Sequence, residues 1–495
     1  MSHIHVNQKG YAEVYTPRRV NGKKVNDPIY LGKVVNLDEG IFFSRKRGYF
    51  RYTIEGGFDD CDLEIPAEQE RLILDFGPAY LLDRLIKAEG FGSLFSGILD
   101  KKKDSLMALL FYRVLEKGGG YLAEDWLAGS YASILFPKAQ LQSQRVSELL
   151  RELGDEAVVR AFFMKYLKKV IPQDRKVGIL IDSTGLPNNI DFYLTAVNNH
   201  GGEINNETRL ILVVDKLTKR PLFFRYNAGN VPDVSTLLAT KDELRIMNVD
   251  IDMIILDAGY PSDVALDELF DEGIPFLSRL KPNRKLYKSL VKTYENEVLD
   301  DGSIVRYPGR LVGIVRKEVR LTDNNDGFAY IAVDHDRRHL EWTKYTLAAI
   351  EDGLSIEERK EKTATQGFFV LVSSEAIDTQ DVLQLYYTRQ AVEQIFDVGK
   401  NDVNLLPLRV HSEETFRGHL MLVFLASITH LLLAEKLMNS KYGAAQVLSI
   451  FRNLKCKVYD KTILVKEPVK KMNDISKILG IHIPARIVEG KEAGR

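Results

Sequence analysis

The chain has 495 residues, of which 45% are hydrophobic and 28% charged, and its formal net charge is −1. This composition is typical of folded globular domains, and the length predicts two to four of them. The near-zero charge excludes a protein that binds nucleic acid through a global basic field and leaves only local basic clusters. The two cysteines, Cys61 and Cys456, are too few for a disulfide framework, so we expect a cytoplasmic protein.

The first residues alternate in the manner of β-strands. Residues 11–20 and 28–35 are two such runs, and Asn21-Gly22 between them is a strong signal for a hairpin turn. Residues 41–54 continue the alternation. We therefore expect an N-terminal β-rich module over residues 1–66.

From about Glu68 the apolar period becomes helical, with short glycine-containing breaks. This pattern predicts a helical region over residues 67–172. Within it, Ser143 could cap a recognition helix over residues 144–153, as in a helix-turn-helix DNA module. A structural helical bundle explains the same pattern equally well. The resemblance described below favours a helical DNA-binding region.

Strand and helix patterns then mix, which favours an α/β sheet. We expect an α/β core over residues 173–285 and 366–440, interrupted by a β-rich insertion over residues 286–365. A C-terminal helical tail is expected over residues 441–495. The apolar run at residues 419–433 is short for a membrane span, and we expect a buried core helix in which His419 and His430 are satisfied.

Aspartates end three of the predicted strands. Asp182 ends one buried apolar run and Asp257 ends another, where an unpaired charge would be costly to bury and where α/β sheets form their sites. Asp215 ends a third run, but a tight turn follows it and Asp is a common turn residue. We therefore interpret Asp215 as structural and the other two as candidates for a site.

A third acid lies on a predicted helix with three partners. Tyr386, Arg389, Glu393 and Lys400 are spaced by three, four and seven residues, which places all four within an arc of about 60° on one helical face. A solvated, salt-bridged face is the alternative. Three carboxylates suit Mg²⁺, or Mn²⁺ as its substitute, and two cations on the same face suit phosphates.

These residues resemble the bacterial insertion-sequence DDE transposases marked by Y-x2-R-x3-E-x6-K. The signature is complete in Tyr386, Arg389, Glu393 and Lys400, and the first two acids match Asp182 in ILIDSTG and Asp257 in IILDAGYPS. The resemblance implies an RNase H-like mixed-sheet catalytic core. It also implies that the three acids are catalytic and bind metal, and that Tyr386, Arg389 and Lys400 contact DNA.

The resemblance further implies an enzyme that cleaves the ends of an insertion sequence and joins the freed 3′-OH to target DNA. Its partners would be double-stranded DNA, as terminal inverted repeats and target, and a second copy of the chain on that DNA. No membrane partner is expected, and the protein would be associated with the nucleoid. The alternatives are a two-metal nuclease without strand transfer, a catalytically silent DNA-binding protein, and a metal-independent carboxylate hydrolase. Trp342 in the insertion would either stack on a displaced base or belong to a local core.

Overall fold

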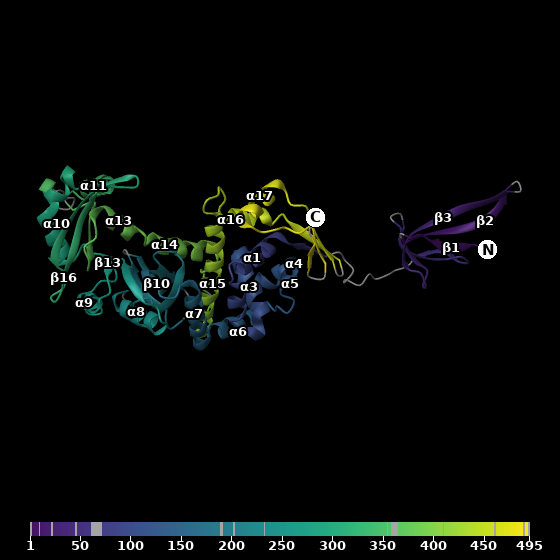
Figure 1. Cartoon of the computed structure of the whole chain (residues 1–495), viewed down its shortest axis with the longest axis horizontal. Coiled ribbons are helices and arrows are strands. Elements are labelled where there is room, and N and C mark those ends of the chain that lie inside the picture. Colours follow the sequence, from purple (N-terminus) through teal and green to yellow (C-terminus); the bar gives the residue numbers. More distant parts are fainter. Residues whose placement is uncertain are drawn as a thin grey trace. The chain divides into compact units, whose positions relative to one another are not determined.

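The computed structural model divides the chain into two compact units, Met1–Leu72 and Ile73–Arg495 (Figure 1). The expected boundary at residue 66 lies outside the residues that the structure describes. The description omits residues 1, 9, 21–22, 45–46, 61–71, 189–191, 201–202, 232, 354, 358–364, 409, 460–461, 489–490 and 494–495.

The first unit is an antiparallel sheet of six strands in chain order. One face of the sheet forms a small core, to which alternate residues such as Ala12, Val14 and Leu31 contribute together with Phe42 and Phe50. The Asn21-Gly22 turn lies outside the described residues, but the strands on either side of it pair antiparallel as expected. The strands are β1 (His3–Val6), β2 (Tyr11–Val20), β3 (Lys23–Asn36), β4 (Ile41–Ser44), β5 (Gly48–Thr53) and β6 (Gly57–Asp60).

The second unit begins with one strand and a group of short helices. Helix α3 is buried along almost its whole length, which makes it the centre of this group. Ser143 was expected to cap the helix that follows it, but it is the first helical residue, because Gln142 has the extended backbone of the cap position. The elements are β7 (Leu72–Asp75), α1 (Gly77–Ala88), α2 (Gly92–Ser96), α3 (Lys103–Leu115), α4 (Ala123–Gly129), α5 (Ala132–Leu135), α6 (Ser143–Leu153) and α7 (Glu156–Val170).

Helix α6, the candidate recognition helix, packs closely on helix α15 (Glu413–Leu437). Val146, Leu149 and Leu150 form its buried side. The two backbones meet at Gly154 and Gly418, where a Cβ atom on either would come within 1.8 Å of a carbonyl oxygen of the other segment. The helix is therefore fixed to the body of the unit by one face, while its opposite face is exposed.

A mixed sheet forms the centre of the second unit. Five of its strands follow the spatial order β11-β10-β8-β12-β13. In order of appearance this is 3-2-1-4-5, leaving out β9, which pairs with β10 off this path. β10 is antiparallel to β8, whereas β12 is parallel to β8 and β13 is parallel to β12. This is the RNase H-like arrangement that was expected. The elements are β8 (Val177–Pro187), β9 (Ala196–His200), β10 (Glu203–Asp215), β11 (Pro221–Ala228), α8 (Leu237–Ile246), β12 (Ile251–Leu256), α9 (Asp263–Asp271) and β13 (Phe276–Arg279).

The expected insertion extends this sheet and also contains two long helices. Strand β17 pairs with β13 on one side and with β16 on the other, so the same sheet continues through β16, β15 and β14. Trp342 on α11 is half exposed, which excludes the local core that was one of its two interpretations. The elements are α10 (Lys285–Val298), β14 (Ile304–Tyr307), β15 (Arg310–Arg320), β16 (Asp326–Asp334), α11 (His335–Glu351) and β17 (Phe368–Ser373).

The C-terminal segment, which was expected to be helical, contributes four strands as well as two helices. Its strands form a second sheet with β7 in the order β21-β20-β19-β18-β7, so the end of the chain packs on the start of the second unit. The elements are α16 (Ala444–Phe451), β18 (Lys455–Tyr459), β19 (Thr462–Val465), α17 (Lys470–Leu479), β20 (Arg486–Val488) and β21 (Lys491–Ala493).

Helix α15 is a core helix, as expected. Among the described residues it is long and apolar enough to cross a membrane, but 78% of its most apolar window is buried inside the structure. His419 Nε2 lies 3.0 Å from the carbonyl oxygen of Leu405, so this histidine is satisfied. His430 is different, since neither ring nitrogen has a hydrogen-bond partner and Asp402 lies 3.8 Å away.

Burial of His419 predicts an acid-sensitive fold. Burial and the neighbouring charge of Arg113 lower the pKa of His419 from 6.5 to about 4. Between pH 6.5 and 4 the unfolded chain therefore binds a proton at His419 that the folded chain does not bind. The stability that depends on a neutral His419 is complete above pH 6.5 and is lost as the pH falls toward 4. A shift of this size corresponds to about 3 kcal/mol of unfolding free energy.

Urea unfolding at a series of pH values measures this effect. His419→Gln keeps a donor for the Leu405 carbonyl but cannot become charged, so its stability should fall less steeply between pH 6.5 and 4. Equal slopes for the two proteins would contradict the prediction.

Candidate active site

Strands β8 and β12 bring the first two acids together. Ile181 on β8 is paired in parallel register with Leu256, the last residue of β12. Asp182 follows Ile181 on β8, and Asp257 is the first residue after β12, so the two acids follow neighbouring positions in one sheet. Asp182 was expected to end its strand, but this was wrong. Strand β8 continues to Pro187, where it pairs with β10. Asp182 lies instead one residue beyond the last position at which β12 pairs with β8.

The third acid lies on a helical segment that is interrupted twice. The single helix that was expected consists of α13 (Thr379–Tyr387), α14 (Gln390–Asp397) and a π-helical turn at Val398–Asp402. The junction at Thr388 and Arg389 keeps helical backbone angles, but its N–H groups bond three residues back rather than four. The tighter and wider turns change the rotation per residue, so the arc calculated for an ideal helix does not apply.

The guanidinium of Arg389 lies among all three acids. Its Nη1 atom is 2.5 Å from Asp182 Oδ2 and 4.0 Å from Asp257 Oδ2, and its Nη2 atom is 2.9 Å from Glu393 Oε1. The carboxylates of two strands and one helix therefore converge on one cation. The sequence predicted that the acids meet, but it did not predict that Arg389 would lie between them.

Asp182 is the most enclosed of the three acids. Its side chain is 13% exposed, compared with 39% for Asp257 and 52% for Glu393. Burial raises the pKa of Asp182 to about 6, and the positive charge of Arg389 and the Ser183 N–H oppose that rise. Arg389 is in turn held firmly charged, since the three acids raise its pKa against the effect of burial.

Two further signature residues contact the strands that carry the acids. The hydroxyl of Tyr386 donates to Asp257 Oδ1 at 3.2 Å, and the side chain is almost completely buried. Lys400 Nζ donates to Thr184 Oγ1 at 2.7 Å, two residues beyond Asp182 on β8. Tyr386 therefore belongs to the acid cluster, whereas Lys400 lies further along β8, beside Thr184.

Asp215 has the structural role that was expected. It is buried at the turn between β10 and β11, where it accepts hydrogen bonds from Leu217 N at 2.8 Å and from the Thr218 hydroxyl at 2.9 Å. Arg175 forms an ion pair with the same carboxylate. All of these partners belong to the turn and its surroundings, and none belongs to the acid cluster.

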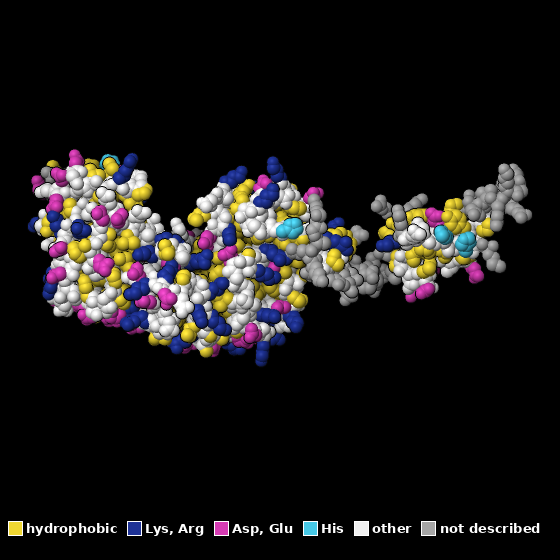
Figure 2. All heavy atoms as spheres, viewed as in Figure 1, with side chains coloured by type: hydrophobic (Ala, Val, Ile, Leu, Met, Phe, Trp, Pro, Cys, Tyr) yellow, Lys and Arg dark blue, Asp and Glu magenta, His cyan; other side chains and the backbone are white. Residues whose placement is uncertain are grey.

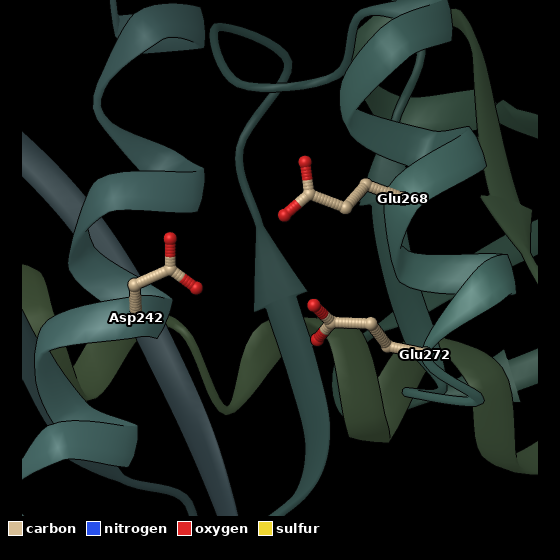
Figure 3. A group of neighbouring side chains, drawn as sticks. All are labelled: Asp242, Glu268 and Glu272. Atoms are coloured by element: carbon tan, nitrogen blue, oxygen red, sulfur yellow. The ribbon is translucent and has the colours of Figure 1, made fainter.

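A second acidic group, on α8 and α9, was not found by sequence reasoning. Asp242, Glu268 and Glu272 face one another with oxygens within 4.8 Å (Figure 3). The buried ammonium of Lys241 lies 2.6 Å from Glu268, 2.7 Å from Glu272 and 3.3 Å from Asp242. Arg245 Nη1 also lies 2.9 Å from Glu272, so two cations offset two of the three negative charges, and these ion pairs join α8 to α9. The spacing of Glu268 and Glu272 by one helical turn was the only available signal.

A family model matches the part of the chain that contains these residues. The family model described as the transposase DDE domain matches residues 173–429. None of the curated proteins matches the chain in sequence. Among solved structures, the piggyBac transposase in its synaptic complex with hairpin DNA is similar at 12% identity, over 82% of this chain and 86% of that one, with a TM-score of 0.39. The Drosophila P element transposase strand transfer complex is similar at 13% identity, over 70% and 83%, with a TM-score of 0.19.

Both TM-scores are too low to support an argument about the fold or the site. The family model carries the assignment, because it covers more than half of the chain, from the start of the RNase H-like core to helix α15. All three acids and the signature residues lie inside the matched range. The chain therefore belongs to the transposase DDE domain family and is a DNA transposase, of an enzyme class that cuts and joins DNA with divalent metal.

Proposed function

We propose that this transposase cleaves the ends of an insertion sequence and joins the freed 3′-OH to target DNA, with Asp182, Asp257 and Glu393 as the metal-binding acids. The observation that carries the proposal is their convergence on the guanidinium of Arg389, at 2.5 to 4.0 Å. Three carboxylates around one cation create a negative potential that favours the binding of positive charge.

The residues fit a hard divalent metal. The donor set is three carboxylates without nitrogen or sulfur, which suits Mg²⁺ and Mn²⁺ better than zinc. When bound among these oxygens, two such ions would activate the attacking oxygen and stabilise the leaving one. Glu393 and Asp257 are accessible enough to exchange Arg389 for an ion, while the Ser183 N–H holds Asp182 Oδ1 in place at 2.8 Å.

The chain's own cations would bind and orient the DNA. Arg389 can turn from the acids to a phosphate without leaving the site, because its guanidinium pairs equally well with either group. Lys400 would contact the backbone further along β8, and Tyr386 would hold Asp257. Lys and Arg side chains gather over the part of the second unit that contains β10 and α14, which is consistent with a DNA path across the site (Figure 2).

A strand-transfer assay tests the proposal. The full chain is given pre-cut DNA carrying the inverted repeats that flank its gene, together with plasmid target and Mg²⁺. Joined products that disappear with EDTA are expected. A second reaction contains uncut ends: if these are cleaved while the pre-cut ends are not joined, the protein is a nuclease without strand transfer. Joining in EDTA would contradict the metal role of the acids. We further propose that two copies of the chain act together on the DNA, and joining of two ends per event would support this.

Lys400→Ala should weaken binding to those DNA ends and make the binding less sensitive to salt. Each phosphate contact adds about 0.9 to the slope of log K against log salt, so one lost contact should reduce the slope by roughly that amount. Fluorescence anisotropy at several salt concentrations measures both quantities. Thr184→Val, which removes only the hydroxyl that accepts from Lys400, is the control and should keep the slope. If Lys400→Ala leaves the salt slope unchanged, Lys400 does not contact a DNA phosphate.

A further inference from the structure

A buried ion pair lies beside the acid cluster, and none of the roles above uses it. Arg209 Nη2, on β10, contacts the two carboxylate oxygens of Asp233 at 3.0 and 2.8 Å. The two side chains are 5% and 16% exposed. Arg209 Nη1 also lies 3.6 Å from the buried Glu207, so three charges are buried together. Burying charges costs free energy that close pairing only partly offsets, so stability alone is a weak reason for this arrangement. Asp233 belongs to a single 3₁₀ turn, Asp233–Ser235, ahead of α8.

Ser183 connects this ion pair to the first acid. Its hydroxyl donates to Asp233 Oδ1 at 2.8 Å and lies 2.8 Å from Arg209 Nη2. Its backbone N–H donates to Asp182 Oδ1 at 2.8 Å. One residue therefore contacts Asp233 with its side chain and Asp182 with its backbone, so a displacement of Asp233 is transmitted to the oxygen of Asp182 that Arg389 does not hold.

The turn after the second acid packs against the same carboxylate. A Cβ atom on Gly259 would lie 2.9 Å from Asp233 Oδ2, so the turn packs directly against this carboxylate and a larger residue would displace it. The backbone N–H of Tyr260 bonds to the carbonyl of Asp257 at 3.2 Å, and its ring is fully buried. Asp233 thus lies between the segment that carries Asp182 and the turn that follows Asp257.

We propose that Asp233, held by Arg209, is a positioning residue that sets the separation of Asp182 and Asp257 and thereby the metal affinity of the site. Both of its oxygens are engaged by Arg209, and one also by Ser183, so Asp233 acts through its neighbours and not as a fourth ligand. The inference rests on the proposed function, in which the two aspartates bind metal. Groups that orient metal ligands in this way typically contribute about 10- to 100-fold in metal affinity.

The test is Mn²⁺ binding to the full-length protein, followed by the loss of the free Mn²⁺ signal in electron paramagnetic resonance. Asp233→Asn keeps the shape of the side chain and removes the charge, and its affinity should fall by about 10-fold or more. Cleavage by this variant should recover partly at high Mn²⁺. Asp215→Asn is the matched control, because it breaks a second buried ion pair at the far end of the same strand β10. Its affinity should stay within about twofold of the wild type.

The outcomes separate this inference from the proposed function. Wild-type affinity in Asp233→Asn, or an equal loss in Asp215→Asn, overturns the inference alone. If the wild type binds no Mn²⁺, or if Asp182→Asn binds as well as the wild type, the proposed metal site fails and the inference fails with it. If circular dichroism shows Asp233→Asn unfolded, Ser183→Ala decides: a weakened affinity supports the inference and an unchanged one overturns it.

Discussion

Asp182→Asn, Asp257→Asn and Glu393→Gln should each reduce cleavage of transposon ends by about 1000-fold or more, because each removes a charged ligand from the site that stabilises the reacting phosphate. Each variant keeps the shape of its side chain. Folding should be nearly unaffected, since Arg389 retains two of its three acids in every case. Single-turnover cleavage with Mg²⁺ and thermal unfolding measure the two effects.

Asp397→Asn is the matched control for Glu393→Gln. Asp397 is exposed one turn further along α14 and has the same kind of side chain, but it contacts none of the three acids. We expect it to retain wild-type cleavage. Full cleavage by any of the three acid variants would show that the substituted acid is not needed for catalysis.

Arg389→Ala should make the stability of the protein depend on divalent metal. Without the guanidinium, the three carboxylates face one another unpaired, and removing one partner of a buried ion pair costs about 3 kcal/mol or more. The partial exposure of Glu393 and Asp257 reduces that cost. In EDTA the variant should therefore melt several degrees below the wild type, and Mn²⁺ should restore more of that loss than it adds to the wild type.

Thermal unfolding in EDTA and across a Mn²⁺ series measures this response. Arg175→Ala is the control, because it breaks the ion pair with Asp215 and leaves the acid cluster intact. It should be destabilised without any gain in its response to Mn²⁺. The same Mn²⁺ response in both variants would mean that Arg389 does not occupy the metal-binding space.

The sequence predicted which acids come together better than how they are arranged. Strand-end acids and a spaced helical signature identify Asp182, Asp257 and Glu393, because these patterns are local. The interruption of the helix at Arg389 and the continuation of β8 beyond Asp182 depend on how α14 and β10 pack, and local periodicity carries no information about that. Asp233 and Lys241 were missed for the same reason, since their partners come from distant segments of the chain.

The fold shows the same division. The core strands and the apolar helix α15 were readable because burial on both sides leaves a continuous hydrophobic run. Strands β18–β21 were missed because they are short, at three to five residues each, and alternate weakly. The insertion was recognised as β-rich, but the pairing of β16 with β17, which makes it part of the central sheet, is a long-range contact that no local pattern specifies.

The pairing of β17 with β13 and β16 also determines when the central sheet can be completed during synthesis. Strand β17 is an interior strand that pairs with β13 and β16, both of which precede it in the chain. Until the ribosome has delivered Phe368–Ser373, both neighbours present unpaired backbone edges of the kind that invite aggregation. Glu393, one of the three proposed metal-binding acids, follows only twenty residues later, so the nascent chain cannot assemble the proposed site before most of its length has emerged.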